Sequence, residues 1–315
     1  MNNLVELCGQ PIAVQMLNSY LKGNLPPLLI LHGPDGTGKW SAAEAFIRQR
    51  LCKVGTGCGS CAPCRMLHKN NHPDFIQFPA DRISIGDPQK PEEFTIRWLI
   101  KTRICYTPFS GQERFILFPA AEHIQHEAET ALLKTLEDVP SHTRFIFITY
   151  DLGALKETIV SRGVCIPFKP LSIEDLRKFG EVQEEHLDLL GGSLHLIPFF
   201  QSELFKELLE RISAGINHPL ELLRLEQWLL GEEKKSFSNY SVSEIYSTLE
   251  MLDIFSLLLI KVCATHQMHR EIWKSIFNFK HELHREMSGF SPYLISRLFN
   301  DLYIILFGNP IGKKI

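Results

Sequence analysis

Short apolar runs alternate with amphipathic segments along the first half of the chain. Five runs have the length and the β-branched and aromatic content of buried strands; they are Leu28–His32, Phe75–Phe78, Arg114–Phe118, Arg144–Thr149 and Val164–Phe168. Segments with helical periodicity lie between them, over Lys39–Leu51, Glu92–Ile104 and Glu122–Asp138. Strands that alternate with helices predict an α/β domain, in which a largely parallel sheet carries helices on both faces.

The pattern changes after Pro170. From Leu171 onward helical periodicity prevails and almost no strand signal is found, with helices expected over Leu220–Leu230, Glu244–His266 and Pro292–Phe307. The sequence therefore predicts three domains. They are an α/β domain over residues 1–168, a small helical lid over 169–212 and an all-α bundle over 213–315.

Composition and charge narrow the class of protein. The 315 residues are 44% hydrophobic and 22% charged, which is typical of a globular chain and excludes disordered and fibrous classes. A formal net charge of -3 argues against nucleic-acid binding by bulk charge alone. The most apolar stretch, Ile254–Ile260, is too short to span a bilayer, and no signal peptide is evident. We expect a cytoplasmic protein with no membrane partner.

Four of the eight cysteines gather between positions 52 and 64, as Cys52, Cys58, Cys61 and Cys64. Structural zinc takes four soft ligands in a tetrahedron, and the glycines between these cysteines allow the tight turns required. Clustered cysteines in the cytoplasm bind metal more often than they form disulfides. The spacing predicts a closed structural zinc site in an insert over 52–64. Redox-active thiols and an iron–sulfur cluster are the alternatives.

A glycine-rich loop follows the first predicted strand and opens a helix. Gly33, Gly36, Gly38 and Lys39 have the spacing of a phosphate-binding loop, whose backbone N–H groups face phosphate oxygens. The next position, where Ser or Thr would ligate magnesium, is Trp40, and Ser41 is rotated by about 100° around the helix. We expect the loop to keep its shape without binding ATP, with an occupied nucleotide site as the alternative.

The strand that should carry the magnesium-binding acid also lacks it. In nucleotide hydrolases of this class an Asp, usually followed by a Glu, lies at the end of such a strand, whereas Arg114–Phe118 ends in Pro119-Ala120. These two residues can neither hold a metal ion nor polarise water. Two independent losses around one metal ion predict that the chain has no ATPase activity of its own.

Several motifs occur together in an order that resembles the AAA+ subunits of the bacterial DNA polymerase III clamp loader. They are Gly9-Gln10, the loop Gly33–Lys39, the four-cysteine insert, His72-Pro73-Asp74, Ala131–Pro140, Phe145–Thr149 and Ile159–Gly163. The resemblance covers roughly residues 1–168 and implies an AAA+-like fold. It places Thr149 at the family's sensor-1 position and His195 at its sensor-2 position, and it implies a C-terminal collar that holds five subunits together.

Ser161-Arg162-Gly163 resembles the family's Ser-Arg-Cys motif. The resemblance implies that Arg162 reaches across a subunit interface as an arginine finger and stabilises charge on the phosphoryl group of a neighbour's ATP. Gly163 stands where the family has Cys, and Cys165 follows two residues later. The alternative for Arg162 is a surface residue at a helix end.

Together, the degenerate sites resemble the family's non-hydrolysing, delta-prime type of subunit. The resemblance implies a stator within the DNA polymerase III holoenzyme that lends Arg162 to a neighbour during loading of the sliding clamp onto primed DNA. Its partners would be the tau/gamma and delta subunits, with the clamp and DNA reached through the complex. Two alternatives stay open: an ATP-hydrolysing tau/gamma type of subunit that uses Ser41, and a nucleic-acid-binding zinc module on an AAA+ scaffold.

Overall fold

The computed structural model describes residues 4, 7–109, 113–180, 187, 190–213, 218–230, 255–259, 269–285 and 292–308. The chain forms two compact units, the first comprising Met1–Glu181 with Leu190–Ile197 and the second Val182–Leu189 with Pro198–Ile315. Of the helix expected over Glu244–His266, the structure describes only 255–259, which are helical. The division into domains at residues 168 and 212 stays a prediction.

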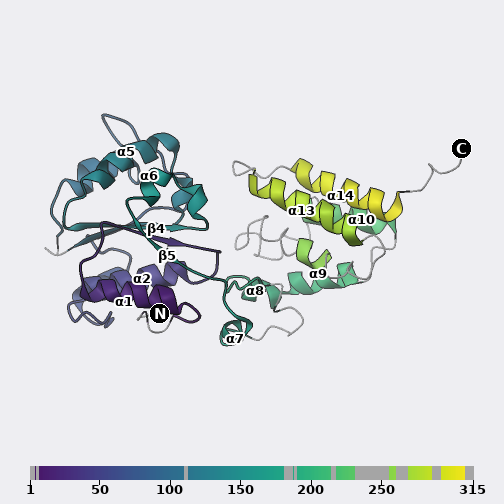
Figure 1. Ribbon diagram of the computed structural model, residues 1–315, viewed down its shortest axis with the longest axis horizontal. Helices are drawn as coiled ribbons and strands as arrows, with labels where there is room; N and C mark the ends of the chain where they lie inside the picture. Colours follow the sequence, from purple (N-terminus) through teal and green to yellow (C-terminus); the bar gives the residue numbers. More distant parts are fainter. Residues whose placement is uncertain are drawn as a thin grey trace, which may run out of the picture. The chain divides into compact units, whose positions relative to one another are not determined.

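A five-stranded sheet forms the centre of the first unit, with the strand order β2-β3-β4-β1-β5 (Figure 1). All four strand pairings are parallel, which confirms the predicted α/β architecture. The strands are β1 (Leu28–His32), β2 (Phe75–Gln77), β3 (Arg114–Phe118), β4 (Thr143–Thr149) and β5 (Val164–Pro167). Each lies within one residue of its predicted bounds, because a strand covered on both faces is a nearly continuous apolar run.

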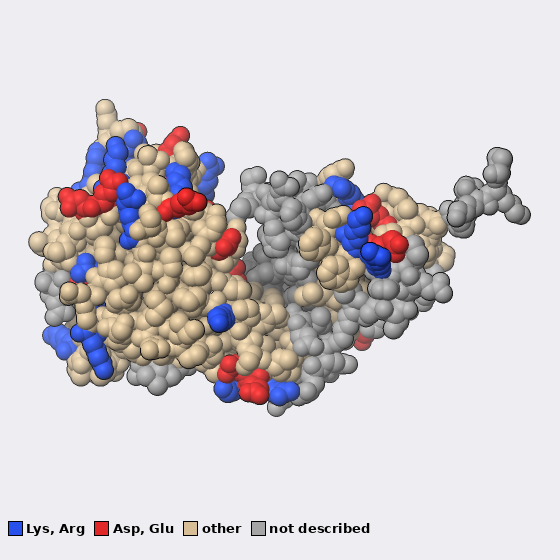
Figure 2. All heavy atoms as spheres, viewed as in Figure 1, with Lys and Arg blue, Asp and Glu red and all other residues tan. Residues whose placement is uncertain are grey.

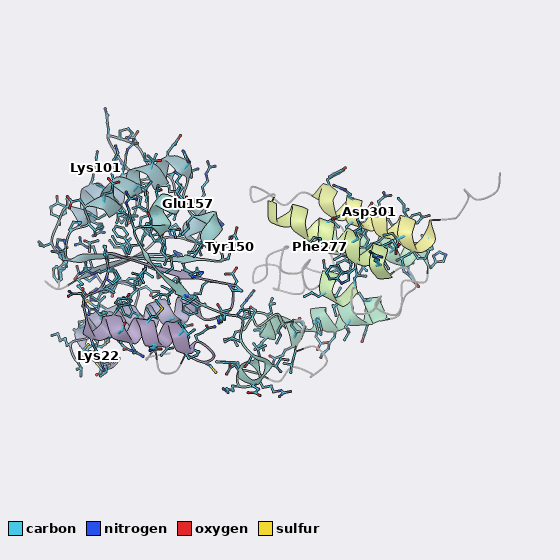
Figure 3. All side chains as sticks on the ribbon, viewed as in Figure 1. Lys22, Lys101, Tyr150, Glu157, Phe277 and Asp301 are labelled. Atoms are coloured by element: carbon cyan, nitrogen blue, oxygen red, sulfur yellow. The ribbon has the colours of Figure 1, made fainter. Side chains whose placement is uncertain are left out.

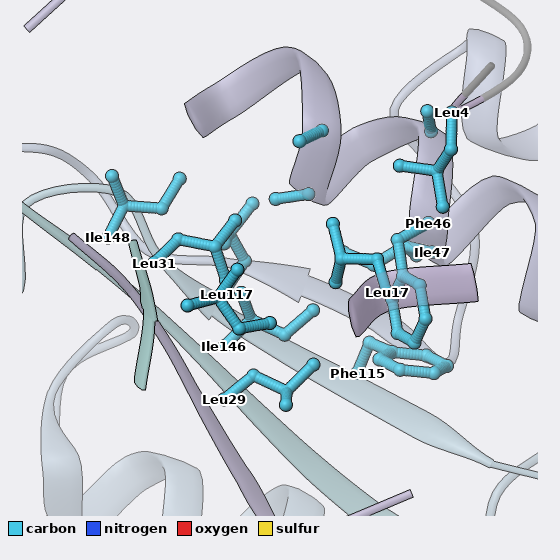
Figure 4. Packing of buried hydrophobic residues seen from close by; sticks show 14 of the residues in the cluster. Leu4, Leu17, Leu29, Leu31, Phe46, Ile47, Phe115, Leu117, Ile146 and Ile148 are labelled. Atoms are coloured by element: carbon cyan, nitrogen blue, oxygen red, sulfur yellow. The ribbon is translucent and has the colours of Figure 1, made fainter. Parts of the chain in front are cut away.

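Two helical layers cover the sheet. The helices α1 (Pro11–Lys22) and α2 (Lys39–Leu51) lie on one face, and α5 (His126–Glu137) and α6 (Glu157–Val160) lie on the other (Figure 1). Each face has its own core. Leu17, Phe46 and Phe115 meet on the α1–α2 side (Figure 4), whereas Leu132, Phe118 and Phe147 are buried on the α5–α6 side.

Two predicted helices begin later than the periodicity indicates. The segment expected to be helical from Glu92 begins only at α4 (Ile96–Leu99) and continues as the π-helix η2 (Ile100–Ile104). Thr95 sets this start, because its side chain accepts a hydrogen bond from the N–H of Trp98. The segment expected from Glu122 is a 3-10 turn, η3 (Ala121–His123), before α5 begins at His126.

The remaining elements are short or helical. The first unit also contains α3 (Ala62–His68), the 3-10 turn η4 (Leu152–Ala154) and α7 (Ile173–Leu176). The helix α8 (Ile197–Phe200) begins at the last residue of the first unit, and the second unit contains α9 (Glu203–Ser213), α10 (Pro219–Leu230), α13 (His269–Arg285) and α14 (Pro292–Phe307). Both α10 and α13 contact α14. Among the described residues no helix is long and apolar enough to cross a membrane.

Candidate functional site

Three left-handed glycines shape the loop between β1 and α2. The φ angles are 135° at Gly33, 69° at Gly36 and 93° at Gly38, a region that favours glycine. A Cβ added at Gly33 would lie 2.0 Å from the carbonyl oxygen of Phe168, and one added at Gly36 would lie 2.0 Å from Ser193 Oγ. The first and second glycines are therefore required by packing within the chain as well as by the turn.

The Lys39 ammonium group is buried and bound by its own loop. Nζ donates hydrogen bonds to the carbonyl oxygens of Gly33 and Pro34, the latter at 2.7 Å, and pairs with Asp35 Oδ1 at 3.1 Å. The Lys39 side chain is only 4% exposed. In a working phosphate-binding loop this ammonium would face phosphate oxygens. Nucleotide binding here would require Lys39 to give up these contacts.

Residues 193–195 pack against the same loop from within the first unit. Ser193 Oγ donates to the carbonyl oxygen of Asp35 at 2.9 Å, and the N–H of Leu194 donates to that of Gly36 at 2.9 Å. His195 Nδ1 lies 2.5 Å from Ser193 Oγ. The structure thus brings His195 to the loop, next to Gly36. That His195 stands at the position of a sensor-2 arginine stays a prediction.

Three carboxylates gather beside the loop. The Glu122 carboxyl group forms a hydrogen bond with Thr149 at the end of β4, but burial dominates and raises the pKa of Glu122. Its Oε2 atom is buried with no hydrogen-bond partner. Burial, together with Glu122, Asp151 and Asp35, also raises the pKa of Tyr150, which follows β4 (Figure 3). Asp35 is paired with Lys39, so Glu122 and Asp151 are the carboxylates that would disfavour a polyphosphate here in the absence of a bound cation.

The two positions that should supply magnesium ligands do not do so. Pro119 and Ala120 follow β3 directly, and neither side chain carries an oxygen or nitrogen atom. The Trp40 indole is 38% exposed and lines a cavity of about 280 Å³ with Ile47, Leu67 and Phe75. Trp40 therefore contributes to a pocket between α2, α3 and β2 rather than to a metal site.

The four-cysteine insert brings its sulfur atoms together. The Sγ atoms of Cys52, Cys58, Cys61 and Cys64 all lie within 4.8 Å of one another. Zinc–sulfur bonds of 2.3 Å in a tetrahedron would place the sulfurs about 3.8 Å apart. The Sγ atoms of Cys52 and Cys61 are 3.9 Å apart. The arrangement fits a four-coordinate metal ion, and it is closed because every position is filled by sulfur.

Backbone N–H groups lower the pKa of one of these thiols. Burial disfavours the thiolate of Cys52, but the backbone N–H groups of Cys58, Val54 and Thr56 outweigh it and lower the pKa to about 5. Burial raises the pKa of Cys64 to about 12. A cation among the sulfurs would favour the thiolate form of all four, so metal binding would release protons.

Arg162 lies at the surface of the first unit, in the turn between α6 and β5. Its Nη2 atom pairs with Glu137 Oε1 at 2.6 Å and its Nη1 atom donates to the carbonyl oxygen of Thr158 at 2.7 Å. The side chain remains 32% exposed. At Gly163 an added Cβ would lie 2.8 Å from Ile30 Cδ1. A larger residue at position 163 would therefore require the Ile30 side chain to shift.

Gln10 is a site residue whose role the sequence does not reveal. Its side chain is buried, and Nε2 donates to the carbonyl oxygens of Thr37 at 3.3 Å and Lys169 at 2.6 Å. Its Oε1 atom accepts from the N–H of Lys169 at 3.0 Å. Gln10 thus ties the glycine loop to the segment that follows β5. The Gly9-Gln10 motif is the only sequence signal, because the partners are backbone groups.

One protein family matches about half of the chain. The family described as "DNA polymerase III, delta subunit" matches residues 9–172. The chain is 31% identical over 175 residues to the DNA polymerase III subunit delta' of Bacillus subtilis, which covers 53% of this chain and 50% of that protein. It is 26% identical over 263 residues to the subunit tau of the same organism, which covers 78% of this chain and 45% of that protein. The chain spans about half the length of these relatives.

A solved structure shares the fold. The gamma subunit-related protein of DNA polymerase III from Thermotoga maritima matches with a TM-score of 0.50 at 15% identity, covering 93% of this chain and 98% of that one. At this identity the likeness concerns the fold alone. It is consistent with the AAA+-like arrangement expected from the sequence.

Proposed function

Because the chain belongs to the family described as DNA polymerase III, delta subunit, we propose that it is a clamp-loader subunit that does not hydrolyse ATP. In this proposal it is a delta-prime type of stator. It lends Arg162 to the nucleotide of an adjacent tau/gamma subunit while the assembly loads the sliding clamp onto primed DNA. The delta subunit is a further partner in the same complex.

The state of Lys39 carries the proposal. An ammonium group that is 4% exposed and bound to the carbonyl oxygens of Gly33 and Pro34 is poorly placed to hold phosphate. The contacts of Ser193 and Leu194 with the loop add to this self-contained geometry. Pro119-Ala120 after β3 supplies no carboxylate for magnesium. The site keeps its shape without the groups that hydrolysis requires.

Arg162 supports the other half of the proposal. Its guanidinium is held by Glu137 and the Thr158 carbonyl group, yet is one-third exposed, so a phosphate on a neighbouring subunit could compete for it. Arginine suits this role because its planar donor groups bind phosphate oxygens in pairs. The remaining parts have supporting roles. Zinc in the four-cysteine insert would be a structural staple, and the helices of the second unit would form the collar.

A tau/gamma type of ATPase is the competing function, since tau subunits are among the relatives. It requires Ser41 to replace the hydroxyl missing at Trp40 and an acid from outside the usual position. A nucleic-acid-binding zinc module is favoured less. Figure 2 shows Lys and Arg mixed with Asp and Glu on the visible face of the first unit, rather than a continuous basic surface.

Nucleotide binding by the isolated chain separates the first two functions. We expect no saturable binding of a fluorescent ATP analogue with magnesium up to millimolar concentration, and no ATP hydrolysis. Hydrolysis that depends on Lys39, lost in Lys39→Ala, would instead assign the chain to the ATPase type.

The finger role is tested in a reconstituted loader. We expect Arg162→Ala to lower DNA-stimulated ATPase and clamp-loading rates at least tenfold, since arginine fingers contribute about 10³-fold or more. Lys156→Ala is the matched control, because Lys156 also forms a surface ion pair, with Glu129 at 2.7 Å, in the same segment. Rates unchanged by Arg162→Ala would refute the role of Arg162.

A further inference from the structure

The strand β2 forms an edge of the sheet that carries unpaired backbone groups. It pairs only with β3, since it is the last strand in the order β2-β3-β4-β1-β5. The N–H of Phe115 donates to the carbonyl oxygen of Asp74, and the N–H of Phe78 donates to that of Leu117. Backbone groups alternate in direction along a strand. The backbone N–H and C=O groups of even-numbered residues in this segment therefore point to β3, and those of Phe75 and Gln77 point away from it.

The outward groups are available for pairing. The N–H of Phe75 is used in a turn, where it donates to the carbonyl oxygen of His72 at 3.1 Å. That leaves the carbonyl group of Phe75 and both backbone groups of Gln77 directed to the open edge, and Gln77 is exposed. An extended chain laid along β2 could form three hydrogen bonds with these groups. Exposed edges of this kind are the usual sites of strand addition.

A cavity flanks this edge on each face of the sheet. The cavity on the α2 face, of about 280 Å³, is lined by Trp40, Ile47 and Leu67. The one on the α4 face, of about 460 Å³, is lined by Phe94, Trp98 and Arg103. Asn70, Phe75 and Gln77 line both cavities. Successive side chains of an added strand point to opposite faces, so adjacent residues would enter the two cavities.

The larger cavity combines an aromatic wall with an unpaired cation. The Phe94 and Trp98 rings lie 5.4 Å apart, and Phe94 has a left-handed φ of 60°, a strained conformation for an aromatic residue. The Arg103 guanidinium lies 5.1 Å from the centroid of Trp98 and has no ion-pair partner within the described part of the chain. Its Nε atom is buried without a hydrogen-bond partner.

The charges favour an acidic occupant. Glu93 is the carboxylate in the lining of the larger cavity, but it is exposed and screened by water, whereas Arg103 is partly buried. A charge that is shielded from water interacts more strongly with an incoming partner. Lys101 lies exposed on the same element, η2, and adds positive charge nearby (Figure 3).

We propose that β2 docks an extended segment of a partner protein, which adds a strand to the sheet beside Gln77. The segment places adjacent apolar side chains in the two cavities and presents a carboxylate to Arg103. This surface includes none of Gly33–Lys39 and does not include Arg162, so the proposal holds whether or not the chain acts as a stator.

The test uses the full chain and a fluorescein-labelled eight-residue peptide with a Val-Phe-Val core flanked by Glu. Fluorescence anisotropy is expected to show saturable binding. Gln77→Pro removes the outward N–H without touching the β2–β3 ladder, and proline is tolerated on edge strands. We expect Gln77→Pro to weaken binding about tenfold relative to Gln77→Ala, the value of one hydrogen bond.

Two further comparisons keep the test decisive if Gln77→Pro does not fold. A peptide with N-methylated core amides, and the Arg103→Gln variant with Lys101→Gln as control, are each expected to lose about tenfold in affinity relative to their controls. The proposal fails if the Glu-flanked peptide does not bind at millimolar concentration, or if binding is indifferent to both backbone changes. Displacement by an oligodeoxythymidine that depends on Arg103 but not on Gln77 would assign the surface to nucleic acid instead.

Discussion

A buried ion pair connects the start of β2 to β3 and gives a quantitative prediction. Asp74 is fully buried and Arg114 is 4% exposed, and Asp74 Oδ1 lies 4.0 Å from Arg114 Nη2. Asp74 Oδ1 also accepts a hydrogen bond from the N–H of Phe109 at 2.6 Å. The guanidinium donates to backbone carbonyl groups of the 103–107 segment. The pair thus holds the segment that forms one wall of the larger β2 cavity.

Asp74→Ala leaves the Arg114 charge buried and uncompensated. Breaking a buried pair in this way costs about 3–5 kcal/mol, and the carbonyl contacts of Arg114 place the expected loss near the lower end. Asp74→Asn keeps an acceptor for the Phe109 N–H and loses only the charge, so we expect about 1–2 kcal/mol. For a unit of this size the two losses correspond to falls in Tm of about 6–12 °C and 2–8 °C.

The assay must isolate the first unit, because a two-unit chain need not unfold in one step. Hydrogen exchange of β3 and β4 amides, followed by mass spectrometry over a urea series, reports the free energy of unfolding of the sheet. Asp81→Ala, at an exposed acid in a nearby loop, is the control and should change that free energy by less than about 0.5 kcal/mol. A loss below about 1 kcal/mol for Asp74→Ala would refute the reasoning.

Three further predictions concern the loop, the insert and the buried acid. Gly36 has φ +69°, and a Cβ added there would lie 2.0 Å from Ser193 Oγ, so Gly36→Ala should lower the free energy of unfolding by about 2–4 kcal/mol and expose residues 190–197 to hydrogen exchange. Gly191→Ala is the control, because Gly191 has φ +56° but open space around it, and it should cost only about 1–2 kcal/mol. Equal costs for the two variants would contradict the packing argument. Purified protein should contain one zinc per chain by atomic emission, and Cys58→Ser should lose it while Cys105→Ser keeps it; equal metal content in both variants would exclude the four-sulfur site. Burial raises the pKa of Glu122, so the ionised carboxylate destabilises the fold when the pH is above that pKa. Glu122→Gln should therefore raise Tm at neutral pH, and the gain in Tm should disappear as the pH falls through the pKa of Glu122. A gain in Tm that does not change with pH would show that the buried charge is not its cause.

The sheet and the glycine loop could be predicted from the sequence because their signals are local. Each strand is an apolar run that ends in a turn, and the loop glycines have a spacing that follows from phosphate geometry. The start of α4 shows the limit. Apolar periodicity extends back to Glu92. The helix nevertheless begins only after Thr95, because Thr95 is its N-cap and Phe94 has a left-handed backbone conformation. A capping residue overrides periodicity when the preceding backbone cannot adopt helical angles.

The site partners could not be predicted, because they depend on contacts between distant segments. The Ser161-Arg162-Gly163 motif singles out Arg162 in the sequence. Its ion pair with Glu137, 25 residues earlier, cannot be predicted in this way, because it depends on how α5 and α6 pack. Gln10 binds backbone groups of Lys169, 159 residues later, and a backbone partner leaves no mark on the sequence. The four cysteines are the exception, since their ligand set lies within one short segment and its spacing alone predicts the cluster.

The contacts of the glycine loop also explain how a nucleotide motif can persist without its catalytic groups. Gly33 packs on the Phe168 carbonyl group and Gly36 on Ser193, and Gln10 binds the Thr37 carbonyl group. Each of these constraints comes from the chain itself and acts whether or not a phosphate is bound. A chain without a magnesium ligand at position 40 or after β3 lacks groups needed for hydrolysis, but the packing constraints on Gly33, Gly36 and Gln10 stay the same. The loop therefore serves the fold of the first unit, whether or not a nucleotide binds to it.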